Sequence, residues 1–173
     1  MPHGARGVRC SVMSTAASAL KTAIFTLFVP AIVAVGIPQT WIREAGVVVA
    51  PGIASRILGT ALVTLGAIGY FWCATLFVKA QGTPAPAFPT QKTVVGGLYH
   101  INRNPMYTSV LAVVFGQAVL YRYRTLAIYG AWLVLGFHLF IILYEEPALH
   151  ARFDGEYEEF CRRVPRWIPR LRS

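Results

Sequence analysis

Long apolar blocks are the feature of this sequence that most restricts its fold. Ile57–Val78 and Leu126–Tyr144 each match the roughly 20 apolar residues that a helix needs to cross about 30 Å of hydrocarbon. Only 13% of the 173 residues are charged and 55% are hydrophobic, whereas about a quarter of a soluble domain is charged. We therefore expect an integral membrane protein with helical spans.

Two shorter blocks complete the expected bundle. Ala23–Ile37 reaches the length of a span if the amine of Lys21 extends to the interface, and Pro30 is expected to kink it. Pro105–Tyr121 begins with a proline, which the first position of a helix accepts because its N–H is not needed there. The predicted fold is all-α, an integral-membrane bundle of about four transmembrane helices with a C-terminal interfacial helix.

The domain prediction is simple: residues 1–15 form a flexible N-terminus, and residues 16–173 form one membrane domain. Residues Val47–Ile53 are apolar but too short to cross, which favours an interfacial or re-entrant piece. The loop Lys79–Leu98 is rich in proline and glycine, and a connection of this length is either a ligand-binding loop or a flexible linker.

The basic residues predict an orientation. Of the 16 Lys and Arg residues, twelve fall in the N-terminal flank, the second loop and the C-terminal tail. The positive-inside rule therefore places both termini and the second loop in the cytoplasm. The net charge of +9 suits contact with anionic lipid, and no nucleic-acid-binding motif accompanies it. The three cysteines lack the spacing of a metal site or a disulfide framework, so no metal is expected.

A tight turn brings two polar clusters together. Only residues 122–124 separate the third and fourth spans, so these helices must form an antiparallel hairpin. Asn104 is expected to cap the third span, and Arg103 beside it adds a charge that fits a carboxylate or phosphate. Glu145 and Glu146 end the fourth span, where the helix dipole disfavours acids, so a compensating partner is expected.

The tail is expected to be amphipathic. Its apolar residues recur every three or four positions, with a turn at Asp154-Gly155; they are Leu149, Phe153, Tyr157, Phe160 and Val164. His138 lies in the middle of the fourth span. We expect a neutral histidine bonded to a carbonyl or hydroxyl group and do not assign it to the site.

These residues resemble a known family. "GLYHINRNPMY", residues 97–107, is similar to the first motif of the integral-membrane methyltransferases that include isoprenylcysteine carboxyl methyltransferase and phospholipid N-methyltransferases. "EEPALHARFDGEYEEFCRRVPRWIP", residues 145–169, resembles their second motif, which ends in V-P-R-x-x-P. Asn104 stands where the family usually has a histidine, so proton transfer at that position is not expected.

The resemblance implies an activity and a site. It implies methyl transfer from S-adenosyl-L-methionine to a lipophilic or membrane-embedded acceptor, with the cofactor bound by residues 79–173 on the cytoplasmic side. Arg163 and Glu146 are implied as catalytic. The implied cofactor-binding residues are Tyr99, Arg103, Asn104, Pro105, Tyr107, Glu145 and Glu146.

Several alternatives remain at this level. Within the fold, the resemblance favours an activity like that of isoprenylcysteine carboxyl methyltransferase, and the alternatives are a phospholipid N-methyltransferase and a small-thiol methyltransferase. Membrane steroid-type reductases share the layout but use a nicotinamide cofactor, and Met106 with the "TSVLAVV" that follows Tyr107 disagrees with their motif. A non-catalytic membrane protein of the same fold is the third possibility.

Overall fold

The computed structural model describes residues 30–48, 52–79 and 97–167. The predicted flexible N-terminus, residues 23–29 of the first span, and most of the loop Lys79–Leu98 lie outside these residues, as do residues 49–51 of the predicted interfacial piece. The described elements are helical: η1 (Ile32–Gly36), α2 (Ile37–Glu44), α3 (Ile53–Lys79), η2 (Gly97–His100), α4 (Pro105–Tyr121), α5 (Arg124–Phe140), η3 (Ile141–Glu145) and α6 (Glu146–Arg163). The expected all-α class is confirmed for this part of the chain.

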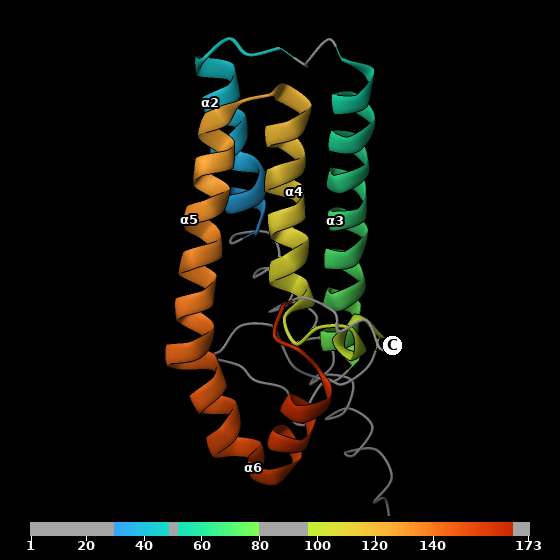
Figure 1. The fold of residues 1–173 in the computed structure, drawn as a ribbon, viewed down its shortest axis with the longest axis vertical. Coiled ribbons are helices and arrows are strands. Elements are labelled where there is room, and N and C mark those ends of the chain that lie inside the picture. Colours follow the sequence, from blue (N-terminus) through green and yellow to red (C-terminus); the bar gives the residue numbers. More distant parts are fainter. Residues whose placement is uncertain (1–29, 49–51, 80–96, 168–173) are drawn as a thin grey trace, which may run out of the picture.

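Three long helices stand side by side and alternate in direction (Figure 1). Two described helical stretches, Ile53–Leu76 and Arg124–Ala151, are long and apolar enough to cross a membrane. Helix α4 occupies the predicted third block, Pro105–Tyr121, but its 17 residues make it shorter. The number of four transmembrane helices stays a prediction.

Helices α3 and α4 pack at close range because glycines face the partner helix. A Cβ atom on Gly66 would lie 2.7 Å from the carbonyl oxygen of Ser109, and one on Gly116 would lie 2.8 Å from the backbone nitrogen of Val63. Close backbone approach of this kind is how helices associate inside membranes, where burial of apolar surface gives little drive. The glycines therefore fix where the N-terminus of α4 sits against the end of α3.

The segment η1–α2 is joined to α4 and α5 by side-chain donors. Pro38 has no N–H, so the carbonyl of Ala34, four residues earlier, lacks the donor that an α-helix would supply from this position. The amide of Gln117 donates to Ala34 O at 2.6 Å, and the hydroxyl of Tyr129 donates to Val33 O at 3.0 Å. Both carbonyls are thereby satisfied from neighbouring helices.

The fourth span does not end at the two glutamates, which corrects the sequence-based expectation. The chain passes from α5 through the π-helical turn η3 directly into α6, so Glu146 is in the first turn of α6. Both glutamates therefore lie inside a continuous helical run and not at a free helix C-terminus. The expected penalty from the helix dipole does not apply to them.

Helix α6 folds back toward α4. A straight helix would separate Glu146 from Cys161 by about 22 Å, yet one nitrogen of Arg103 lies 3.0 Å from Glu146 and 2.9 Å from Cys161. Figure 1 shows α6 reversing at the end of the bundle. The sequence predicted a turn at Asp154-Gly155, but the structure is helical at both residues, so the reversal is made by a bend within α6.

Candidate functional site

The start of α4 is built by a run of buried polar groups. Asn104 occupies the N-cap position, but its side chain makes no capping bond, which corrects the prediction. Its Nδ2 donates instead to the carbonyl of Arg166 at 3.1 Å. Its backbone N–H donates to Asn102 Oδ1 at 3.0 Å, and Thr108 Oγ1 donates back to its carbonyl. Pro105 then begins the helix.

The turn η2 holds Tyr99 beneath this helix start. Gly97 has a φ of +61°, and a Cβ atom there would lie 3.0 Å from Trp72 Nε1, so the position favours glycine on both grounds. Tyr99 is buried, and burial raises the pKa of its phenol well above the ordinary value. The hydroxyl therefore stays protonated at physiological pH.

Glu146 lies between two arginines. Its Oε1 accepts from Arg103 Nη1 at 3.0 Å and from Arg166 Nε at 2.9 Å, and its Oε2 accepts from Arg166 Nη2 at 2.7 Å. The Arg166 contact is bidentate, the strongest geometry for a guanidinium and a carboxylate. These bonds to Glu146 raise the pKa of Arg166. We call Arg103, Glu146 and Arg166 the Arg–Glu–Arg cluster.

Glu145 has a different partner. Tyr107, whose ring packs 4.9 Å from that of Phe137, donates its hydroxyl to Glu145 Oε2 at 2.9 Å. Within the described residues no lysine, arginine or histidine forms an ion pair with Glu145. Within the described residues, Glu146 thus has two arginine partners, whereas the partner of Glu145 is a neutral hydroxyl.

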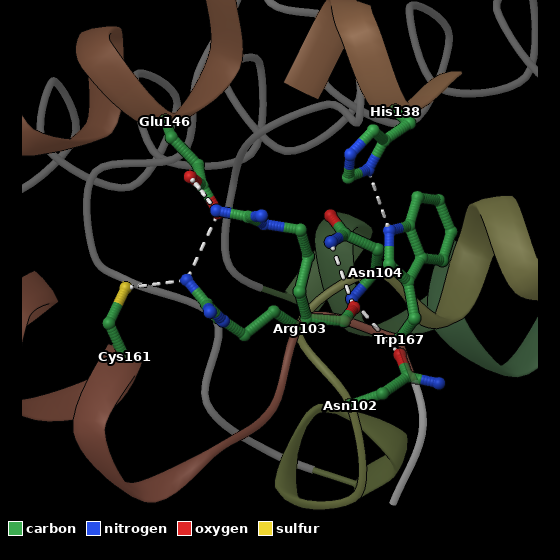
Figure 2. Close-up of polar contacts among 8 residues, drawn as sticks. Asn102, Arg103, Asn104, His138, Glu146, Cys161 and Trp167 are labelled. Atoms are coloured by element: carbon green, nitrogen blue, oxygen red, sulfur yellow. Dashed lines mark hydrogen bonds and ion pairs between the residues drawn. The ribbon is translucent and has the colours of Figure 1, made fainter. Parts of the chain in front are cut away.

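Residues Val164–Trp167, here called the C-terminal strap, cross the start of α4. The backbone N–H of Arg103 donates to Pro165 O at 2.9 Å, and Val164 is buried. The indole of Trp167 donates to His138 Nδ1 at 3.1 Å (Figure 2). The histidine partner is therefore an indole and not the predicted carbonyl or hydroxyl.

Arg103 combines a dense set of contacts with one unpaired donor. Its Nη1 donates to Glu146 and to Cys161 Sγ, as Figure 2 shows. Its Nε is buried and has no hydrogen-bond acceptor within the described part of the chain. A buried donor without an acceptor costs about 1–3 kcal/mol.

The structure brings together most of the residues that the sequence assigned to the site. Arg103 reaches Glu146 and Tyr107 reaches Glu145 across the α4–α5 hairpin, so the predicted proximity of the two clusters is confirmed. Asn104 and Pro105 begin α4, with buried Tyr99 in η2 before them.

Arg163 is the exception. Its guanidinium pairs with Glu159 one turn back on α6, and both side chains are about two-thirds exposed, at 69% and 66%. Arg166 occupies the place that sequence reasoning assigned to Arg163. The motif V-P-R-x-x-P could have identified Arg166 as the arginine of the site, because the arginine of this motif corresponds to Arg166. The contact of Cys161 had no such signal, since it depends on the bend of α6.

Metal ligands do not gather among the described residues. No group of three or more His, Cys, Asp or Glu side chains in that part of the chain is placed to hold a metal ion.

The chain is similar in sequence to a known protein family and to a metal-resistance protein. The family model described as phospholipid methyltransferase matches residues 54–156, more than half of the chain. The nickel-cobalt-cadmium resistance protein NccN of Alcaligenes xylosoxydans xylosoxydans is 29% identical over 135 residues, which cover 77% of this chain and 54% of that protein. The chain thus spans about half the length of this relative. No solved structure matches. The family match runs from the start of α3 into α6 and includes Arg103, Tyr107, Glu145 and Glu146, and it shows that the chain belongs to the phospholipid methyltransferase family.

Proposed function

We propose that this chain is an S-adenosyl-L-methionine-dependent methyltransferase that acts on a lipophilic acceptor in the membrane. The proposal rests on two polar groups that lie at the same end of the hairpin and each lack a partner of opposite character. Arg103 Nε is a buried donor without an acceptor among the described residues, and Glu145 is a carboxylate without a cation there. A ligand that carries both a carboxylate and an ammonium complements such a pair.

The residues of the chain take distinct roles in this proposal. Arg103 holds the donor carboxylate, supported by the first turn of α4, where Asn104 and Pro105 set the helix start and its N–H groups favour an anion. Glu145 takes the ammonium or the ribose hydroxyls, with Tyr107 orienting it. Glu146 has both oxygens occupied by arginines. It therefore acts as a positioning residue for Arg103.

The chemistry requires little else from the protein. When bound, the donor supplies a methyl group already activated by its sulfonium, so no residue nucleophile is needed. The chain has to orient the reactants and exclude water. Tyr99 and Asn104 are both less than a tenth exposed, which keeps this end of α4 dry. The family description favours a phospholipid as acceptor; lipophilic carboxylates and thiols are the alternatives.

Calorimetry with purified protein in detergent tests the proposal directly. Wild-type protein is expected to bind S-adenosylmethionine, and Arg103→Gln and Glu145→Gln to weaken binding at least tenfold, because each loses a charged contact worth about 1.5–3 kcal/mol. Arg162→Gln is the matched control, since the Arg162 side chain is 79% exposed and its ion pair among the described residues is with Glu158, also on α6. Absence of binding heat with wild-type protein contradicts the proposal.

The acceptor is identified in a second step. Protein supplied with methyl-labelled donor and total membrane lipid is expected to label a lipid, and the labelled head group names the acceptor class. Label confined to a water-soluble thiol contradicts the lipid assignment.

A further inference from the structure

We propose that His138 binds the methyl acceptor by donating a hydrogen bond from Nε2 to an anionic oxygen of that amphipath. The inference rests on the proposed function, and it concerns the acceptor, whereas the Arg–Glu–Arg cluster and Glu145 concern the donor. Nothing in the family match assigns a role to this residue.

The bond to Trp167 fixes the state of the imidazole. An indole nitrogen can only donate a hydrogen bond, and Trp167 Nε1 lies 3.1 Å from His138 Nδ1. His138 Nδ1 must therefore accept, which requires a neutral ring with its proton on Nε2. Trp167 thus holds His138 as a hydrogen-bond donor and occupies the lone pair that a general base would use.

The remaining N–H faces no described acceptor. His138 is half-buried on α5 and makes no other hydrogen bond within the described residues. Its neighbours one turn away on the helix surface are apolar and exposed: Val134 is 40%, Leu135 46% and Ile142 37% exposed. A polar N–H at an apolar membrane surface is costly unless it finds an acceptor.

His138 lies between this apolar surface and the proposed site of the methyl donor. Phe137, the preceding residue, packs against Tyr107, and Tyr107 reaches Glu145. In Figure 2 the second ring nitrogen of His138 points away from Trp167. An amphipath with its tail along Val134, Leu135 and Ile142 would present its polar group to His138, next to the proposed methyl donor.

The chemistry of the N–H defines the class of acceptor. A neutral imidazole N–H binds an anionic oxygen with a charge-assisted hydrogen bond. A phosphodiester beside a lipid amine and the carboxylate of a lipophilic acid both offer such an oxygen. The two are separated by experiment, using phosphatidylethanolamine for the first and S-farnesylcysteine for the second.

The test measures amphipath binding and donor binding separately. Purified protein is incubated with each amphipath, and the retained molecules are quantified by native mass spectrometry. His138→Leu is expected to lower the affinity for the retained amphipath at least tenfold while the affinity for S-adenosylmethionine, measured by calorimetry, is unchanged. His138→Gln is expected to recover most of the binding, because its amide can accept from Trp167 and donate to the ligand.

Two further variants complete the design. Trp167→Phe keeps an aromatic ring but removes the indole N–H, so amphipath binding is expected to fall severalfold. His150→Leu removes an exposed histidine of α6 that packs on Tyr157, and it is expected to bind both ligands like wild type. The proposal is overturned if wild type retains neither amphipath, or if His138→Leu retains as much as wild type. If wild type does not bind S-adenosylmethionine, the proposed function is overturned. The comparison of amphipath retention by wild type and His138→Leu then still decides whether His138 binds an amphipath.

Discussion

Two arginines near the C-terminus differ in their surroundings more than in their sequence context. Arg163 is exposed and pairs with Glu159, and exposed pairs one turn apart on a helix contribute only about 0.3–0.5 kcal/mol. Arg166 binds Glu146 with two nitrogens, and the Glu146 side chain is only 13% exposed. The same residue type therefore has a surface role at one position and a structural role in the site at the other.

This contrast predicts opposite results for the two substitutions. Arg166→Gln is expected to weaken S-adenosylmethionine binding five- to tenfold, because Glu146 loses its bidentate partner and no longer fixes Arg103. Arg163→Gln is expected to bind the donor like wild type. Calorimetry on both variants checks this. Equal losses would return Arg163 to the site, as the sequence alone suggested.

At the scale of an element, the helical segment η1–α2 depends on donors from elsewhere. Pro38 removes one backbone N–H, and the side chains of Gln117 and Tyr129 donate to the carbonyls of Ala34 and Val33. Gln117 is 5% exposed and also accepts from Gln39 at 3.0 Å. These bonds explain why an amide lies in the middle of the apolar helix α4.

A double-mutant cycle tests this dependence. Gln117→Leu is expected to lower stability in detergent by about 1 kcal/mol, a typical value for one hydrogen bond. In a Pro38→Ala background the same change is expected to cost less, because the alanine restores the missing backbone donor. Thermal unfolding of the four proteins gives the coupling. Additive losses would show that the proline and the amide act independently.

At the scale of the whole molecule, the hairpin predicts which regions share a membrane face. In a cysteine-free background, Arg162→Cys reports on the site end of the bundle and Arg124→Cys on the start of α5 at the opposite end. An impermeant maleimide is expected to label Arg162→Cys only from the cytoplasmic side and Arg124→Cys only from the other side. Labelling of both from one side would contradict a membrane-spanning hairpin, and exchanged sides would reverse the predicted orientation.

The sequence predicted the parts of this architecture that depend on local chemistry. Apolar length located α3 and α5, Pro105 located the start of α4, and the short turn at residues 122–124 brought Tyr107 to Glu145. The contacts of Arg166 and Cys161 depend on the bend of α6, which no periodicity in the sequence encodes. The side chain of Asn104 was misplaced because the strap offers it the carbonyl of Arg166, a tertiary contact that overrides the usual cap.

The C-terminal strap also has a consequence for biosynthesis. Pro165 accepts from the backbone of Arg103, and Arg166 completes the Arg–Glu–Arg cluster. Residues 164–167 are translated after helices α2 to α6, so these helices can enter the membrane before the Arg–Glu–Arg cluster is assembled. On the proposed function, the newly made chain is expected to be inactive until the strap has been made.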